Sequence, residues 1–211
     1  MTLAELRAEV WEHLSTTAGA QTFWTDADID QAINEGYAEM SDASEWNELV
    51  ITLPLLAGRP YYDLRTICDR PVLSVKAIWN PGTHRWLLPA KADDLDRINL
   101  RWEIVNGQPL TYFLRGLFWL GLYPKIASEV GSVQAKISVQ PDPLVEDGDS
   151  PGFPEPFHHG LVDYAVSDLW MQDAEATKGL THWKDYVERE QALVNSVADR
   201  VGATAGGMML P

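Results

Sequence analysis

The sequence predicts an α+β fold with N-terminal helices, a central, mostly antiparallel β-sheet, a C-terminal helical pair and a flexible tail. Three observations favour it: apolar residues recur at helical spacing near both ends, they form short β-type runs in the middle, and small residues and glycines follow the last helix. With 211 residues, of which 45% are hydrophobic, the chain can bury a substantial core. We expect one domain over residues 1–200.

The first helix is expected at about residues 2–15, where apolar side chains recur every three or four positions and Thr2 and Glu5 are spaced as a capping box. The second is expected at about residues 25–41. Thr25 is suited to cap it, and Asp26 and Asp28 lie where the helix dipole favours negative charge. The apolar stripes are Leu3, Leu6, Val10 and Leu14 in the first helix, and Ile29, Ile33, Tyr37 and Met40 in the second.

A sheet region follows at about residues 49–140, where β-type runs are separated by proline and glycine. Apolar and polar residues alternate from 132 to 139, which indicates a strand with one buried face. An acidic stretch at Asp93–Asp96 is expected to form a short helix. The other expected strands are Leu49–Leu53, Val72–Trp79, Leu110–Leu114 and Leu117–Leu122.

Residues 141–156 are dense in proline, aspartate and glycine, and we interpret them as a linker on the surface. Helices are expected again over residues 157–200, either continuous or broken near Gly179. Residues 201–211 form the expected flexible tail. Its last four residues, Met208, Met209, Leu210 and Pro211, are candidates for docking on a partner, because methionine and leucine are adaptable apolar side chains; an end without any role is the alternative.

The formal net charge of −15 means that the free chain repels nucleic acid, so the sequence argues against a DNA-reading role. The charge is compatible with a surface past which DNA slides. Residues 25–48 carry no basic side chain, and Asp26, Asp30 and Glu35 are candidates for such a surface. A solvated outer face is an equally good interpretation.

We predict no catalytic, cofactor or metal site. The sequence has no phosphate-binding loop and no hydrolase or metalloprotease motif. Cys68 is the single cysteine and has no neighbouring base. His158, His159 and Asp163 come nearest to a metal cluster, but adjacent histidines on a helix point about 100° apart. They are better interpreted as polar residues of a first helical turn.

Nine tryptophans are unusual for this length, and several crowd the sheet region with tyrosines. They could form a carbohydrate-binding platform, but strands and protein interfaces also favour aromatic side chains. We favour the core and interface use. These residues are Trp79, Trp86, Trp102 and Trp119, with Tyr61, Tyr62, Tyr112 and Tyr123.

Six short motifs follow one another along residues 1–198. They are Trp24-Thr25-Asp26 before a helix with Asn34-Glu35-Gly36-Tyr37, Trp46 before a strand, Pro60–Leu64 before the strand Val72–Trp79, Gly107-Gln108-Pro109 with Tyr112, Trp119–Pro124, and Asp147–Pro154 before a helix with Leu161–Ala165. In this order they resemble the phage head-to-tail adaptor (connector) proteins.

The resemblance implies a non-enzymatic virion subunit that forms a ring beneath the portal protein, with twelve copies because the portal is twelvefold. Such a ring extends the DNA channel, lets DNA pass without sequence-specific binding and presents a platform to tail or nozzle proteins. Without a signal peptide or membrane span in the sequence, we expect assembly in the host cytoplasm and no membrane partner.

Three alternatives remain. A tail-completion or tail-tube subunit would be dominated by β-structure. A carbohydrate-binding module would be expected to carry a secretion signal and fewer helices. An enzyme with an undetected site is the third, and the missing motifs argue against it.

Overall fold

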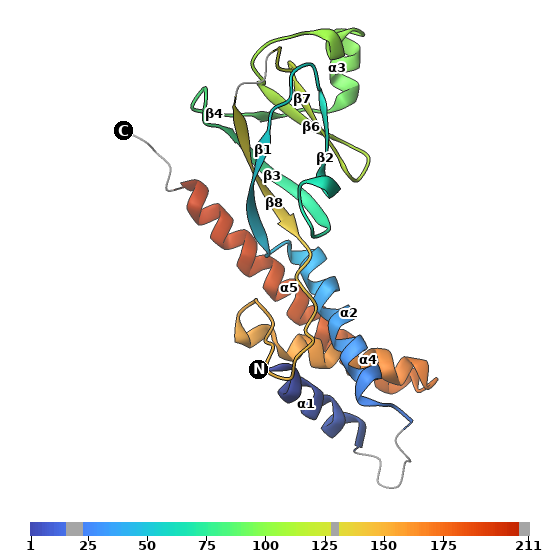
Figure 1. Cartoon of the computed structure of the whole chain (residues 1–211). Coiled ribbons are helices and arrows are strands. Elements are labelled where there is room, and N and C mark those ends of the chain that lie inside the picture. Colours follow the sequence, from blue (N-terminus) through green and yellow to red (C-terminus); the bar gives the residue numbers. More distant parts are fainter. Residues whose placement is uncertain (16–22, 128–130, 207–211) are drawn as a thin grey trace. The chain divides into compact units, whose positions relative to one another are not determined.

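The structure, a computed structural model, describes residues 1–15, 23–127 and 131–206 (Figure 1). The predicted fold class is confirmed, because helices at both ends of the chain enclose a β region in the sequence. Where the sequence suggests one domain, contacts divide the chain into two compact units. We call residues 1–47 and 141–211 the helical unit and residues 48–140 the sheet unit.

The helical unit begins with α1 (Leu3–Ser15) and α2 (Asp26–Ser44), close to the two predicted ranges. Both predicted caps form. The Thr25 hydroxyl accepts the Asp28 N–H, and the Asp28 carboxylate accepts the Thr25 N–H at 2.8 Å. In the same way Glu5 accepts the Thr2 N–H at 2.9 Å. The caps satisfy N–H groups that have no partner inside a helix.

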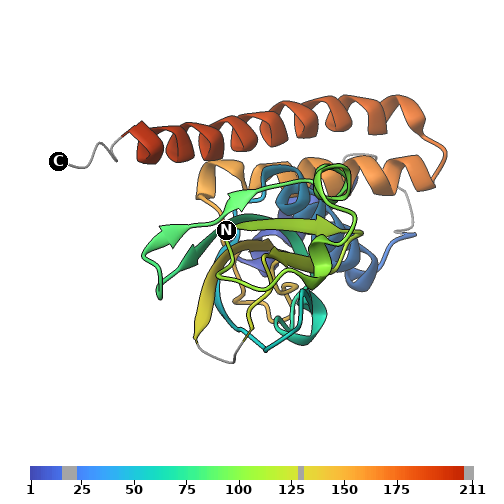
Figure 2. The ribbon, with the colours of Figure 1, turned by 90° about the horizontal axis from the view of Figure 1, so that it is seen from above.

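The C-terminal pair consists of α4 (His159–Gln172) and α5 (Ala176–Gly206), which run along each other (Figure 2). The helices part at residues 173–175, where Ala174 has φ +61°. The predicted break near Gly179 is therefore wrong. Gly179 lies inside α5 at a close helix crossing, where a Cβ atom would come within 3.0 Å of the Ser167 carbonyl oxygen.

The tail begins later than the sequence suggests, because α5 continues to Gly206 and so includes residues 201–206. The candidate docking residues Met208, Met209, Leu210 and Pro211 lie outside the described residues.

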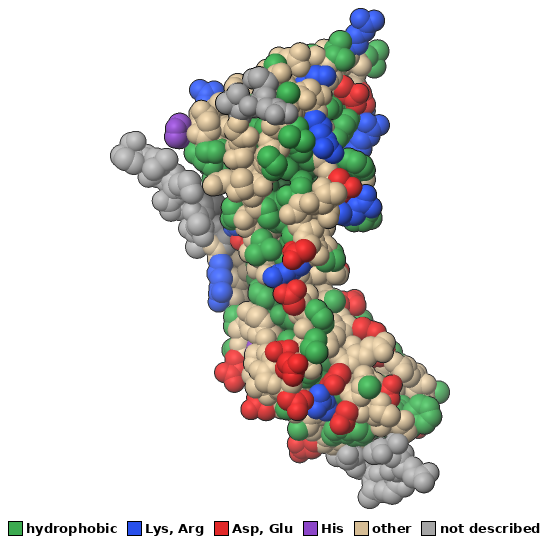
Figure 3. Space-filling view, in the orientation of Figure 1, with side chains coloured by type: hydrophobic (Ala, Val, Ile, Leu, Met, Phe, Trp, Pro, Cys, Tyr) green, Lys and Arg blue, Asp and Glu red, His purple; other side chains and the backbone are tan. Residues whose placement is uncertain are grey.

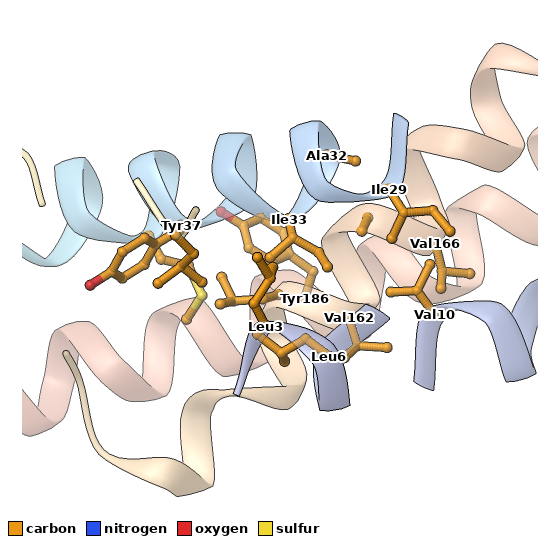
Figure 4. Close-up of a cluster of buried hydrophobic side chains, with 14 of the residues drawn as sticks. Leu3, Leu6, Val10, Ile29, Ala32, Ile33, Tyr37, Val162, Val166 and Tyr186 are labelled. Atoms are coloured by element: carbon orange, nitrogen blue, oxygen red, sulfur yellow. The ribbon is translucent and has the colours of Figure 1, made fainter. Parts of the chain in front are cut away.

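A single apolar core fills the helical unit (Figure 4). The predicted stripes of α1 and α2 face it, with Ile29 and Ile33 fully buried. Burying one such side chain contributes about 1.5–3 kcal/mol. The residues that join the stripes there include Leu161, Val162, Ala165, Val166 and Leu169 from α4 and Tyr186 and Leu193 from α5.

The predicted surface linker is partly a core element instead. Leu144 and Phe153 are only 6% and 3% exposed and pack in the helical core. The backbone of this segment also caps α1, since the carbonyls of Asp149 and Asp147 accept the N–H groups of Leu3 and Ala4 at 2.7 and 3.2 Å. Breaker residues exclude regular structure, but they do not prevent an irregular segment from being buried when its polar groups find partners.

The sheet unit contains two four-stranded sheets rather than the one predicted. The first has the order β1-β8-β3-β4 and the second β2-β7-β6-β5, and among the strand pairs of the described residues β5–β6 alone is parallel. The bounds are β1 (Glu48–Pro54), β2 (Tyr61–Asp63), β3 (Val72–Asn80), β4 (Arg85–Trp86), β5 (Leu88–Pro89), β6 (Thr111–Arg115), β7 (Trp119–Tyr123) and β8 (Ser132–Val139).

Strand β8 lies between β1 and β3 and shows the predicted alternation over residues 132–137, and all four of its predicted apolar positions are fully buried. Ser138, expected on the solvated face, is also buried. The acidic stretch forms α3 (Ala92–Ile98), which is longer than expected.

The aromatic residues of the sheet unit are partly buried in its core and partly exposed. Trp102 is 3% exposed in a small core with Leu95 and Phe113, whereas Trp86 and Trp119 are 53% and 41% exposed. Cys68 is buried.

Candidate functional site

Charge is distributed unevenly between the two units. The sheet unit holds 11 of the 16 basic residues but only 8 of the 31 acidic ones, a formal charge of +3. The helical unit is left with −18. On the face drawn in Figure 3, red side chains accordingly dominate the helical unit and blue side chains are concentrated on the sheet unit. The net charge of −15 therefore does not describe every surface of the molecule.

The motif Asn34-Glu35-Gly36-Tyr37 organises the helical unit. The Asn34 side chain bonds both backbone groups of Leu144, accepting its N–H at 2.7 Å and donating to its carbonyl at 2.9 Å. Gly36 allows α4 to approach, because a Cβ atom there would lie 2.8 Å from the Tyr164 ring. The Tyr37 hydroxyl accepts the Gly152 N–H at 2.9 Å. Three residues of the motif thus hold the buried segment and α4 against α2.

The remaining motif residue, Glu35, points to an open groove of about 750 Å³ on the helical unit. Four carboxylates border this groove and no lysine or arginine does. We call it the acidic groove. Its lining is Glu35, Ala38, Glu39, Asp42 and Ala43 from α2, Tyr164 from α4 and Glu190 from α5.

Two side chains at or near the acidic groove have raised pKa values, mainly because they are buried. Burial, and then the charges of Glu39, Asp168 and Glu35, raise the pKa of Tyr164 to about 12. Burial, reinforced by Glu35, also raises the pKa of Asp168, although a hydrogen bond from Gln172 opposes the rise. Burial is the larger cause of both shifts, and the neighbouring carboxylates add to it. The four carboxylates of the lining make the acidic groove suited to a cationic group.

The predicted channel-facing residues do not form one surface patch. Asp26 accepts a hydrogen bond from the Trp11 indole N–H at 2.8 Å. Asp30 forms a bidentate ion pair with the Arg7 guanidinium, with N···O distances of 2.7 and 2.8 Å, and this pair links α1 to α2. Only Glu35 of the three lines the acidic groove. The absence of basic residues from residues 25–48 did not predict the Arg7–Asp30 ion pair, because Arg7 lies in α1.

The spacing of acidic residues in α2 is a signal from which the groove could have been found in the sequence. Glu35, Glu39 and Asp42 are spaced four and three residues apart, which places them on one helix face. The contributions of Tyr164 and Glu190 come from distant helices, and no local pattern predicts them.

The histidine pair is divided between different partners. His158 is buried at 4% exposure, and its Nε2 donates to the Phe153 carbonyl at 2.8 Å while Nδ1 lies 2.9 Å from the Met1 amino nitrogen. His159 Nδ1 lies 2.9 Å from Glu9. Asp163 pairs with Arg189 at 2.8 Å. The interpretation as polar residues of a first turn therefore fits His159 and fails for His158, which belongs to the interior.

Metal-binding clusters and membrane-spanning helices are both absent from residues 1–15, 23–127 and 131–206. These residues contain no group of three or more histidine, cysteine, aspartate or glutamate side chains placed to hold a metal ion. They also contain no helix that is both long and apolar enough to cross a membrane.

An uneven charge distribution of this kind steers the association of a protein with its partners, but it does not specify the partner. The comparison with known families specifies the class: the model of the SU10 adaptor protein family matches residues 1–207. The chain belongs to this family and is a phage adaptor, a structural protein of the virion. No curated protein matches it.

Proposed function

We propose that this chain is the ring subunit of a head-to-tail connector. It docks on the portal protein, extends the DNA channel and offers a platform to tail or nozzle proteins. The single observation that carries the proposal is the family match over residues 1–207. Twelve copies follow from the resemblance to connector proteins, and assembly takes place in the host cytoplasm.

The uneven charge supports a ring. A ring is closed by heterologous contacts, in which two different surfaces of neighbouring copies meet. A helical unit of −18 and a sheet unit of +3 provide surfaces of opposite character on each copy. The acidic surface also suits the passage of DNA without sequence-specific binding, through a repulsion that salt screens over about 8 Å.

Negative-stain imaging of the purified chain, alone and with the portal protein of the same phage, tests this function. We expect rings seated on the portal with a continuous central channel. A chain that binds tail components but never the portal would instead be a tail-completion subunit.

Of the three acidic residues proposed to face the DNA channel, Glu35 remains the best candidate. Asp26 and Asp30 instead bind Trp11 and Arg7 within the chain. Replacing Glu35 and Glu39 with lysine tests it. A channel role requires intact rings and slowed DNA ejection.

The C-terminal residues Met208, Met209, Leu210 and Pro211 remain our proposed docking peptide for the portal or a neighbouring subunit. Because α5 extends to Gly206, truncation after Gly206 removes the peptide without cutting the helix. We expect unchanged thermal stability and loss of portal binding. Complete rings of the truncated protein on the portal would refute the docking role.

A further inference from the structure

The turn at the end of α3 exposes apolar side chains that its own unit does not cover. Ile98 is 82% exposed and Leu100 is 88% exposed, the highest value among the large hydrophobic residues described. The backbone on either side is anchored. Leu95 and Trp102 are buried in the small core, and the Trp102 indole N–H donates to Asp96 at 2.7 Å. The turn, residues 97–101, is therefore held in place before any partner arrives, which lowers the entropic cost of binding.

Two arginines flank the exposed pair. Arg97 lies 3.7 Å from Asp94 in an exposed pair, and such pairs contribute little. Arg101 is fixed through its backbone, whose N–H donates to the Asn99 side chain at 2.9 Å, and its guanidinium forms no ion pair within the described parts of the chain. The turn is thus an apolar projection between two cationic groups.

The acidic groove of the helical unit has the complementary character. Its four carboxylates surround two small side chains, Ala38 and Ala43, and the ring of Tyr164. Glu35 and Glu39 form no ion pair with a basic side chain among the described residues, so the groove has no internal counter-charge for them. An apolar floor with an acidic border matches an apolar projection with a basic border.

We propose that the turn of residues 97–101 docks in the acidic groove of a second copy of this chain. The proposal rests on the ring function proposed above, because a ring needs two different complementary surfaces on each subunit. Ile98 and Leu100 lie against the alanines and Tyr164, while Arg97 and Arg101 approach the carboxylates. In this arrangement Glu35 lies at a subunit interface, and intact rings of the Glu35→Lys, Glu39→Lys chain would favour the channel role instead.

Disulfide trapping tests the contact directly. A chain carrying Leu100→Cys is mixed with a chain carrying Ala43→Cys under mild oxidation, and covalent dimers are measured. Both positions are exposed, and the native Cys68 is buried. We expect dimers to form at least fivefold faster than with Ala8→Cys, an exposed alanine in a second groove of about 690 Å³ lined by Glu5, Glu9 and Glu12. Equal rates at the two positions overturn the proposal.

Charge reversal tests the chemistry of the same contact. Arg97→Glu with Arg101→Glu, placed in the Leu100→Cys chain, should slow trapping at least tenfold. Glu35→Lys with Glu39→Lys in the Ala43→Cys chain should then restore it. The matched control is Arg85→Glu with Lys125→Glu, which removes the same charge elsewhere in the sheet unit. If the control slows trapping equally, only net charge matters and the specific contact is refuted.

Failure of the contact and failure of the ring function are distinguishable. Rings on the portal in which Leu100→Cys and Ala43→Cys give no cross-link overturn this inference and leave the proposed function intact. A specific cross-link from a chain that forms no ring on the portal supports the contact and overturns the ring function.

Discussion

The helical unit and the sheet unit differ in where they place their apolar and charged side chains. In the helical unit the apolar residues converge on one core, and acidic side chains cover the outside. The sheet unit carries 12 of the 18 large hydrophobic residues that are exposed in the described structure, although it is the smaller unit. The sheet unit therefore carries most of the exposed large apolar side chains and the helical unit most of the charge.

The largest expected effect is on the free energy of unfolding, and it should differ between a buried and an exposed isoleucine. Ile33→Ala should lower the free energy of unfolding by about 2–5 kcal/mol, because the side chain is fully buried and leaves a cavity. Ile98→Ala in the sheet unit should change it by no more than about 0.5 kcal/mol. Urea titration followed by circular dichroism measures both. A large loss from Ile98→Ala would mean that the turn supports its own fold.

A smaller effect is expected where α2 meets α4. Gly36→Ala should destabilise the chain by about 1–3 kcal/mol, because its Cβ atom would lie 2.8 Å from the Tyr164 ring and the core would be overpacked. Gly148→Ala is the matched control, since nothing lies within 4 Å of its Cβ position. In a chain that already carries Tyr164→Ala, adding Gly36→Ala should cost less free energy of unfolding than it does in the unmodified chain. Strict additivity would show that the two residues do not touch.

The smallest expected effect depends on pH. Burial lowers the pKa of His158, so the unfolded chain binds a proton at a pH where the folded chain does not. The contribution of His158 to stability is therefore present above the ordinary histidine pKa of about 6.5 and lost as the pH falls below it. Melting temperatures between pH 8 and pH 5 should fall less steeply for His158→Gln than for the unmodified chain.

Local patterns predicted those parts of the fold that depend on neighbouring residues. The capping box at Thr2 and Glu5 spans three positions, and the alternation in β8 has a period of two. Strands β4 and β5 have only two residues each, which is too short for any period to show. At Gly179 the low helix propensity of glycine favours a break, but the lack of a side chain serves close helix packing there instead.

The candidate site was less predictable, because its partners come from distant segments. The Arg7–Asp30 pair joins residues 23 positions apart, and the Asn34–Leu144 pair joins residues 110 apart. The positions of acidic residues in the sequence therefore could not separate Asp30, which stabilises the fold, from Glu35, which faces the groove. Nor could the sequence distinguish the exposed Ile98 and Leu100 from core residues of the same type.

The order of the two units along the chain has a consequence for synthesis. The sheet unit is continuous, whereas the helical unit is interrupted by it, so α1 and α2 leave the ribosome before Leu144, α4 and α5 exist. At about 5–20 residues per second, the intervening segment takes roughly 5–20 s to translate. During this delay the nascent helices expose Ile29, Ile33 and Tyr37. The acidic residues of α2 give this exposed segment a net negative charge, and like charge disfavours association between neighbouring nascent chains.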